Sequence, residues 1–341
     1  MADVQSRLQR NYAELEAATG TVNNTAGVAN VAATDAFLCE SLAIDSDQPE
    51  NERPDKTGVL GLVAGTAGRK TSSWSMRCSL AGSGAAGTAP DIDVFLRALM
   101  GQAGVVSAGV SVTYERGETG APPTLTLWDF NALATGEQRA LAGAVVQRAR
   151  FDIGGNFGMV EFSGQGKSLI TSNGFATLDT PSKCSLTAFP AEPASRTIAG
   201  SSVQGYKGTI TLDGNTYTTL RTGYVEIVYA RELPGDAFNS DLPGNPSDGR
   251  VAVTVGLNMY DDDSANFSAL KVKAQNKSAL VDFAFVIGTV AGNIWTFTIK
   301  NVRLNTPRID YGNTKRVVDF GTSPAHITSA TAKDDFKVVL T

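Results

Sequence analysis

Regular alternation of apolar and polar side chains is the feature that most constrains the fold of this chain. From Trp74 to Leu80 every second residue is apolar, and the residues between them are Ser or Arg. Successive side chains of a strand point to opposite faces of a sheet, so this pattern predicts a half-buried β-strand. Similar alternation recurs at Val112/Tyr114, Leu125/Leu127, Ala149/Phe151/Ile153, Val225/Ile227/Tyr229, Val251/Val253/Val255/Leu257, Phe283/Phe285/Ile287 and Trp295/Phe297/Ile299. The chain is therefore predicted to be mainly β.

Two short stretches with helical spacing interrupt the strands. The first, at 90–100, has Pro90 at the first helical position, an apolar stripe that includes Phe95 and Leu99, and Gly101 after its end. The second, at 264–274, follows three aspartates, which we expect to form a solvated helix start, and has Ser264 as its N-cap. Asp213-Gly214 predicts a tight hairpin turn between two further strands.

The order of these elements repeats, with offsets that cluster near half the chain length. Strand 72–80 matches strand 251–259, the first helix matches the second, and the strands near 112, 126 and 150 match those near 283, 297 and 318. We therefore expect duplicated antiparallel β-sandwich or split-barrel domains, each with one short helix, at 58–195 and 196–341. A regular all-β chain whose periodicity arises by chance is the alternative. Residues 1–57 are expected to form an N-terminal arm and, at 45–57, a charged loop. Residues 8–17 fit a short helix and a strand equally well.

Composition gives little support for a protein that grips nucleic acid and excludes little else. The net charge is -5 and no run of Lys and Arg occurs, whereas a protein that binds DNA by its phosphates normally has a basic patch. The three cysteines, Cys39, Cys78 and Cys184, do not make a disulfide framework, and Cys78 is expected in the core. The start Met1-Ala2-Asp3 does not resemble a signal peptide, and no stretch of about 18 apolar residues occurs. We expect assembly in a reducing cytoplasm and no membrane insertion.

Motifs for catalysis or metal binding are incomplete. The segment 65–71 lacks the Gly directly before Lys-Thr that a phosphate-binding loop needs. The acidic run 261–263 lacks the alternating ligands of a calcium loop, and His326, the one histidine, is expected on a surface loop. No Gly-x-Ser-x-Gly element supplies a nucleophile. We therefore expect no enzymatic activity, no cofactor and no metal site.

The Gly-rich run 79–90 and the helix after it carry a resemblance to a known family. The run SLAGSGAAGTAP leads into FLRALMG at 95–101, and the two are similar to the strand, Gly-rich link and "aP…LLra-G" helix of the tail tube proteins of long-tailed bacteriophages. Leu15 to Thr21 resembles the family's "E-x-x-x-G-T" opening. Two segments, Leu141 to Ala144 and 151–164, resemble its "l-x-G-a … f-x-f-x-G" strand pair. The resemblance covers most of residues 8–170 by motif and the second half by pattern.

This resemblance implies a structural role in a virion tail that is assembled in the host cytoplasm. Tail tube subunits form closed rings, and the rings stack into a tube that conducts the genome and the tape-measure protein and ends at a tail terminator protein. One sheet of each domain joins the sheets of its neighbours around the lumen, which removes exposed edge strands. With two domains in each chain, three chains would form a ring with pseudo-sixfold symmetry; with one barrel unit in each chain, six would be needed.

The lumen must let DNA slide. A bore lined with unopposed positive charge would hold the phosphates, whereas a neutral or negative one would not. The residues that could line the lumen lie on the strand face opposite the apolar one. We expect the lumen-facing residues to include some of Asp152, Glu161, Glu226 and Asp319, with Arg148 or Arg150 paired to acids or turned towards neighbouring subunits.

Other functions remain open at this point. A tail terminator, a connector or a capsid decoration protein would share the composition and much of the fold. A carbohydrate-binding β-sandwich would need exposed aromatic side chains on one sheet face, whereas Trp74, Trp128 and Trp295 lie in apolar strand contexts. A hydrolase is disfavoured by the missing nucleophile and metal motifs.

Overall fold

The computed structural model describes residues 9–25, 28–52, 64–118, 121–131, 138–171, 202–235, 240–262, 264–277, 279–312, 314–328 and 333–341. Within them the protein is mainly β, its strands pair antiparallel, and two short helices interrupt them, as the sequence predicted. The predicted turn at Asp213-Gly214 is confirmed, because both residues have the positive φ that such a hairpin needs.

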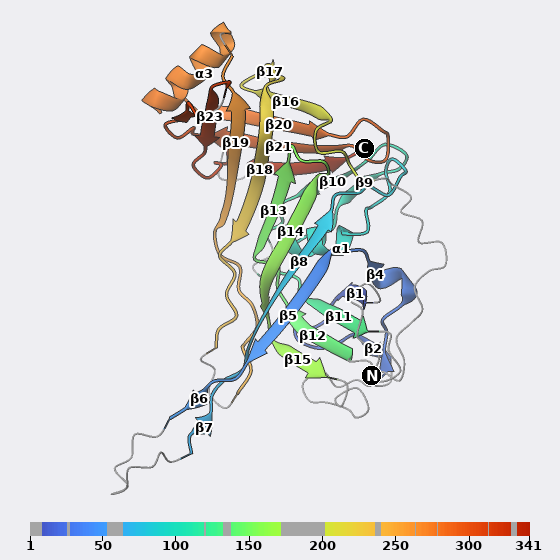
Figure 1. The fold of residues 1–341 in the computed structure, drawn as a ribbon. Coiled ribbons are helices and arrows are strands. Elements are labelled where there is room, and N and C mark those ends of the chain that lie inside the picture. The colour runs from blue at the N-terminus through green and yellow to red at the C-terminus, as the bar shows by residue number, and fades with distance from the viewer. Residues whose placement is uncertain are drawn as a thin grey trace, which may run out of the picture.

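An eight-stranded sheet is the largest sheet of the molecule and runs diagonally through Figure 1. Its order is β5-β8-β14-β13-β18-β19-β23-β22. The bounds are β5 Ser41–Asp47, β8 Thr71–Ser79, β13 Arg148–Ile153, β14 Met159–Gly166, β18 Leu220–Tyr229, β19 Val251–Tyr260, β22 Arg308–Asp310 and β23 Val317–Gly321. Strands from both halves of the chain meet where β13 pairs with β18, with Phe151 opposite Val225.

Two smaller sheets lie on one side of this sheet (Figure 1). A five-stranded sheet has the order β15-β12-β11-β1-β4, with β1 Gln9–Leu15, β4 Ala36–Phe37, β11 Leu125–Asn131, β12 Gln138–Ala144 and β15 Ser168–Thr171. A seven-stranded sheet has the order β17-β16-β20-β21-β24-β10-β9, with β9 Val105–Ser107, β10 Ser111–Glu115, β16 Gly208–Leu212, β17 Asn215–Tyr217, β20 Val281–Ile287, β21 Trp295–Val302 and β24 Phe336–Leu340. The remaining elements are short: β2 Asn24–Thr25, β3 Val28–Ala29, η2 Ala33–Asp35, β6 Glu50–Asn51 and β7 Thr66–Ala67.

The main core fills the space between the eight-stranded sheet and the two smaller sheets. Phe151 of β13 contacts Phe297 of β21 with ring centroids 4.9 Å apart, which joins the large sheet to the seven-stranded one. A second, smaller cluster lies on the other face of the five-stranded sheet, where Val22 and Val31 pack with Tyr12 and Trp128. Burial of these apolar surfaces is the main favourable term in folding.

Both predicted helices are present, as α1 Asp93–Met100 and α3 Ala265–Asn276. Ser264 is the N-cap of α3, because its hydroxyl accepts a hydrogen bond from the Phe267 amide at 3.2 Å. The prediction for Pro90 was wrong: α1 begins at Asp93, and the Pro90 carbonyl accepts from the Asp93 amide in the turn before it.

Each helix places one phenylalanine between two other aromatic rings. Phe95 of α1 contacts Phe37 at 5.0 Å and Phe162 at 5.5 Å between ring centroids. Phe267 of α3 contacts Tyr217 at 6.2 Å and Phe320 at 5.8 Å. These aromatic clusters fix both helices to the inner face of the eight-stranded sheet, since Phe162 and Phe320 belong to β14 and β23.

The N-terminal segment differs from the expected arm. β1 lies inside the five-stranded sheet with Tyr12 and Ala13 buried, and β5 forms an edge of the eight-stranded sheet. Alternation gives β5 one apolar face, whereas β1 is covered on both faces, and the polar average composition of the segment concealed both. In the charged segment, β6 pairs with β7 and the pair projects away from the sheets (Figure 1). The expected domain boundary at 195/196 lies outside the described residues.

Arg231, which follows β18, joins distant parts of the core. Its side chain has no exposed surface, and its Nε donates to Asp248 Oδ1 at 2.6 Å. Its two Nη atoms donate to the carbonyl oxygens of Ala98, Leu99 and Val146 at 2.7–2.9 Å. The last carbonyls of a helix have no partner within it and attract positive charge, so Arg231 completes the end of α1.

Replacing Arg231 with Met should lower the free energy of unfolding by about 3 kcal/mol, because it leaves Asp248 and three carbonyl groups without their buried donor. Urea denaturation of the purified chain measures this change. Lys333→Met, at an exposed position, is the control. Equal, small losses for both variants would contradict the role given to Arg231.

Candidate functional site

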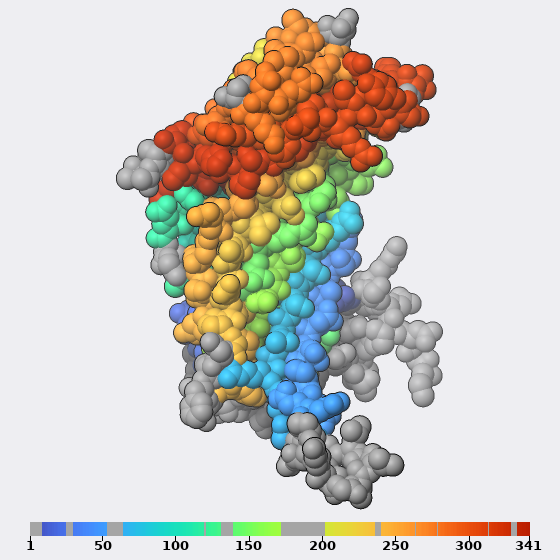
Figure 2. All heavy atoms as spheres, turned by 90° about the vertical axis from the view of Figure 1, so that its left-hand side faces the viewer, coloured from blue at the N-terminus to red at the C-terminus, as the bar shows by residue number. Residues whose placement is uncertain are grey.

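One face of the eight-stranded sheet is open to solvent. Figure 2 shows β19, β18, β13, β14, β8 and β5 as bands side by side, from orange through yellow and green to blue, with no other element in front of them. Along β13 the side chains of 149, 151 and 153 are buried, whereas those between them point to this open face. We call this surface the polar sheet face. Its charged residues include Asp45, Asp47, Arg77, Arg148, Arg150, Asp152, Glu161, Glu226, Arg308, Asp310 and Asp319.

The structure brings all six residues singled out from the sequence onto the polar sheet face. Arg150 lies directly between Glu161 on β14 and Glu226 on β18. Asp152 lies on the same strand as Arg150, and Asp319 lies on β23, opposite Asn258 of β19. Residues directly opposite on neighbouring antiparallel strands share a face. Whether this face lines a lumen remains a prediction.

The two arginines are paired with acids of the same chain. Arg148 donates from Nε to Glu226 at 2.6 Å and from Nη1 to Glu161 at 3.1 Å. Arg150 donates to Asp152 at 2.9 Å and its guanidinium lies 4.2 Å from the centre of the Tyr224 ring. The hydrogen bond to Asp152 is the main reason that the pKa of Arg150 is raised. The positive charge of Arg148 and Arg150 is thus opposed locally, and carboxylates outnumber guanidinium groups among the described residues of the face.

A shallow hollow of about 590 Å³ lies over the centre of the polar sheet face. Gly256 contributes no side chain to its floor, and Arg150, Tyr224 and Asp319 line it. Asp319 accepts a hydrogen bond from the Asn258 amide group. Arg308, on the edge strand β22, lies opposite Asp319.

Sequence reasoning missed Arg77, Arg308, Asp310, Asp45 and Asp47 on this face. A signal for two of them was present. Arg150-Phe151-Asp152-Ile153-Gly154 and Arg308-Ile309-Asp310-Tyr311-Gly312 share Arg, Asp and Gly at the same spacing. The predicted half-length offset matched the strand near 150 to the strand near 318, and therefore hid this similarity.

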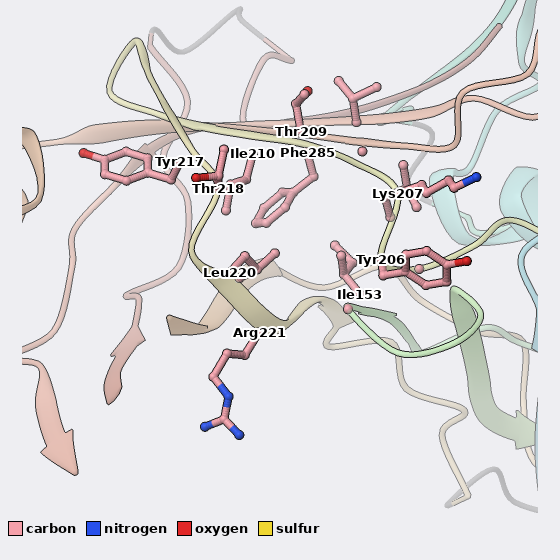
Figure 3. A pocket seen from close by; sticks show the side chains of 15 residues that line it. Ile153, Tyr206, Lys207, Thr209, Ile210, Tyr217, Thr218, Leu220, Arg221 and Phe285 are labelled. Atoms are coloured by element: carbon pink, nitrogen blue, oxygen red, sulfur yellow. The ribbon is translucent and has the colours of Figure 1, made fainter. Parts of the chain in front are cut away.

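A second hollow, a crevice of about 130 Å³, lies where β16, β18 and β20 meet the end of β13. In Figure 3, Ile153, Ile210, Leu220 and Phe285 surround it, with Lys207 and Arg221 at its margin. Among the described residues that line it there is no carboxylate, His or Cys, and its polar side chains belong to Tyr, Lys, Thr and Arg residues.

Other residues considered for chemistry have structural surroundings. Within the described ranges, no group of three or more His, Cys, Asp or Glu side chains could hold a metal ion. His326 is exposed in a loop, as predicted. Cys78 is buried, as predicted; Cys39 is half-buried and its sulfur accepts a hydrogen bond from the Asn11 side chain at 3.2 Å; Cys184 lies outside the described residues. The prediction of a solvated helix start was wrong for Asp261, which pairs with Lys271 and Arg316 and is 4% exposed.

The tryptophans cannot form a sugar-binding platform. Trp74, Trp128 and Trp295 are buried, with at most 3% of each side chain exposed. Trp74 uses its indole nitrogen to donate to the Val145 carbonyl at 3.2 Å. Stacking on a sugar ring requires an exposed aromatic face, which none of the three offers.

Glu16 holds together several segments next to the five-stranded sheet. Its Oε2 accepts from the Gly20 amide at 2.7 Å and the Thr124 hydroxyl at 2.6 Å. Its Oε1 accepts from the Gly143 amide at 2.7 Å and the Thr126 hydroxyl at 2.8 Å. Gly20 and Gly143 both have positive φ, and a Cβ atom at either would meet Lys167 at 2.5–2.6 Å. Glycine is required at both positions.

Glu14, two residues earlier, is also buried, with 9% of its surface exposed. Asn23 donates one hydrogen bond to it, at 3.3 Å. Burial disfavours the charged form and raises the pKa of Glu14 to about 7. The folded state therefore holds a proton on Glu14 more tightly than the unfolded state does.

No protein-family model and no curated protein matches the chain. Among solved structures, a FadL homologue of Pseudomonas aeruginosa is 10% identical over 97% of this chain and 87% of that one, with a TM-score of 0.07. A TM-score of this size carries no argument about fold or function. Among the residues that the structure describes, no helix has the length and apolar character needed to cross a membrane.

Glu14→Gln should make stability less dependent on pH. In the unchanged chain the free energy of unfolding falls as pH rises from about 4.5 through 7, because the buried carboxyl must lose its proton. At pH 8 the variant should be more stable by about 2–3 kcal/mol, and at pH 4.5 the two should agree within about 1 kcal/mol. Denaturant titrations at both pH values measure this, with exposed Glu118→Gln as control. A variant that is equally or less stable at pH 8 would contradict the raised pKa.

Proposed function

We propose that this chain is the structural subunit of a phage tail tube, forming closed rings that stack around passing DNA. The observation that carries the proposal is the eight-stranded sheet, which has one open polar face and two unpaired outer edges. Among the described residues no strand pairs with the outer side of β5 or of β22. Open edges invite pairing with another chain, and closure of a sheet into a barrel removes them.

Duplication of the domain is part of this proposal. The eight-stranded sheet divides into β5-β8-β14-β13 and β18-β19-β23-β22. The smaller sheets run β15-β12-β11-β1-β4 and β24-β21-β20-β16-β17, the second extended by β10 and β9. In chain order, the first half supplies β1 and β4 to its small sheet, β5 and β8 to the large sheet, then α1, then β11 and β12 to the small sheet, β13 and β14 to the large sheet, and β15 to the small sheet. The second half repeats this order with β16 and β17, β18 and β19, α3, β20 and β21, β22 and β23, and β24. Agreement of both chain order and pairing order favours tandem copies of one domain.

The side chains support the same correspondence. Phe95 and Phe267 are each the third residue of their helix, and each contacts an aromatic ring on the second small-sheet strand and another on the large sheet. Glu161-Phe162 in the first half matches Asp319-Phe320 in the second. The strand before each carries the Arg-x-Asp-x-Gly segment. The match of the first helix to the second agrees with this correspondence. The match of β10 to β20 does not, because β9 and β10 have no counterpart in the second half.

The resemblance to tail tube proteins gains a physical reason from Glu16. Glu16 and Gly20 belong to the "E-x-x-x-G-T" opening, and Gly143 belongs to the "l-x-G-a" segment. Both glycine amides donate to the Glu16 carboxylate, so two separate motifs form one hydrogen-bonded unit. Motif residues that meet in space are more informative than the same letters scattered along a chain.

In the proposed ring the polar sheet face lines the lumen. Asp152, Glu161, Glu226 and Asp319 would face the DNA there, with Arg148 and Arg150 held by acids. Phosphates would meet no unopposed ring of arginines, so the DNA would slide. The tape-measure protein, the tail terminator, the virion and the host cytoplasm enter the proposal through the family resemblance. So does the absence of a cofactor and of enzymatic activity.

Concentrated purified protein should form rings or tubes with three chains in each ring, because each chain supplies two equivalent four-stranded units. Negative-stain images show the tubes, and native mass spectrometry of rings counts the chains. Rings of six chains with one barrel unit each would refute the duplication. A protein that stays monomeric at every concentration would argue against the tube itself.

Adding positive charge to the polar sheet face should make tubes retain DNA. Ser75 is exposed on β8, next to Arg77, and its side chain lies on this face. Ser75→Arg tubes should bind short duplex DNA at low salt, and binding should weaken steeply as salt rises. Ser75→Glu is the matched control and should bind no more than unchanged tubes. Equal DNA retention by both variants, in co-sedimentation, would contradict the electrostatic argument for this face.

A further inference from the structure

The junction between β13 and β18 is a template for contact between two copies of the chain. By the correspondence above, β13 ends the first four-stranded unit and β18 begins the second. β22 ends the second unit in the same way, and β5 begins the first. β22 therefore corresponds to β13, and β5 corresponds to β18. The pair that would continue the pattern, β22 with β5, does not exist within one chain.

The pairing registers fix which residues correspond. Arg77 lies opposite Glu161, and Asn258 lies opposite Asp319, the counterpart of Glu161. Ser41 lies opposite Arg77, and Thr222 lies opposite Asn258. Ser41 of β5 therefore corresponds to Thr222 of β18.

The same registers give the charged pair at the junction. Four residues beyond Ser41 and Thr222, Asp45 corresponds to Glu226. On the partner strands, Arg308 lies opposite Asp319 as Arg150 lies opposite Glu161, so Arg308 corresponds to Arg150.

We propose that β22 of one copy pairs antiparallel with β5 of the next copy, with Arg308 opposite Asp45 and Asp310 opposite Ala43. This register repeats the internal one, in which Arg150 lies opposite Glu226 and Asp152 opposite Tyr224. The inference deepens the proposed ring and rests on it, because it names the surfaces through which the ring closes. Its partner is a second copy of this chain.

Charge favours this register. Arg308 and Asp45 are both exposed in the single chain and lie on the polar sheet face. Opposite charges directly across an antiparallel pair stabilise it, whereas like charges destabilise it. A shift of one residue would place Arg308 on the apolar face of the neighbouring strand, since side chains alternate.

Exposed apolar side chains at the two edges agree with it. Ile153, which follows Asp152, is 5% exposed because it inserts into the crevice of the second unit (Figure 3). Its counterpart Tyr311, which follows Asp310, is 72% exposed.

The opposite wall of the crevice shows the same relation. Thr218 lines that wall and follows Tyr217, as Leu38 follows Phe37. Leu38 is 43% exposed. The proposed pairing brings Tyr311 of one copy towards Leu38 of the next, where both lose contact with water.

A charge exchange tests the register. Arg308→Asp and Asp45→Arg, each alone, place like charges opposite each other in every subunit contact. Each should raise the protein concentration needed for assembly by at least about tenfold. The double variant R308D/D45R restores opposite charges and should assemble within about threefold of the unchanged chain. Sedimentation velocity measures assembly. Lys333→Asp, at an exposed position that belongs to neither β22 nor β5, is the control.

The outcomes separate this inference from the proposed function. Far-ultraviolet circular dichroism and the Tm of dilute monomer show whether each variant is folded. Two results would overturn the β22–β5 register but not the proposed tube. The first is that either single variant forms rings as well as the unchanged chain does. The second is that the folded double variant assembles no better than the single variants. If the protein forms only open chains or dimers, and their formation is lost in the single variants and restored in the double variant, the register is upheld and the closed ring is overturned. A chain that shows no self-association at any concentration would overturn both.

Discussion

The pairing of β13 with β18 is the interaction on which the rest of the structure depends. It turns two four-stranded units into one sheet, so that a single apolar face continues across both halves of the chain. Phe151 at this junction lies opposite Val225 and packs on Phe297, which connects the large sheet to the second small sheet. Without this pairing the two halves would each present an open edge, and the polar sheet face would be divided.

Buried polar groups reinforce this arrangement where the sheets cannot. Arg231 leaves the end of β18 and reaches back to the last carbonyls of α1, so that the second half completes a helix of the first. Glu16 does the same for the loops next to the five-stranded sheet, accepting from two amides and two hydroxyls. A buried charge is stable only when its partners are in place, so both residues favour one arrangement over all others.

The sequence allowed the fold class, both helices and most long strands to be predicted, because alternation and the Ser264 cap are local signals. It could not place β1 or β5, whose apolar residues stand among many polar ones. It also could not show which strands are equivalent, since β9 and β10 shift the spacing between the halves. The six candidate residues lie on one face because period-two alternation fixes sides. The partners that pair with these six residues lie on other strands. The register between two strands depends on both of them and cannot be read from the sequence of one strand alone.

The hairpin of β9 and β10 has a consequence for how the molecule is made. It emerges directly after α1, in the first half, yet β10 pairs with β24, in the second. During synthesis β10 must wait until the ribosome has delivered β24, and the contact that completes the seven-stranded sheet spans most of the chain. Contacts of such long range form slowly. The contact between β10 and β24 therefore forms only after the second half has been made, and in the proposed ring only a complete chain would join its neighbours.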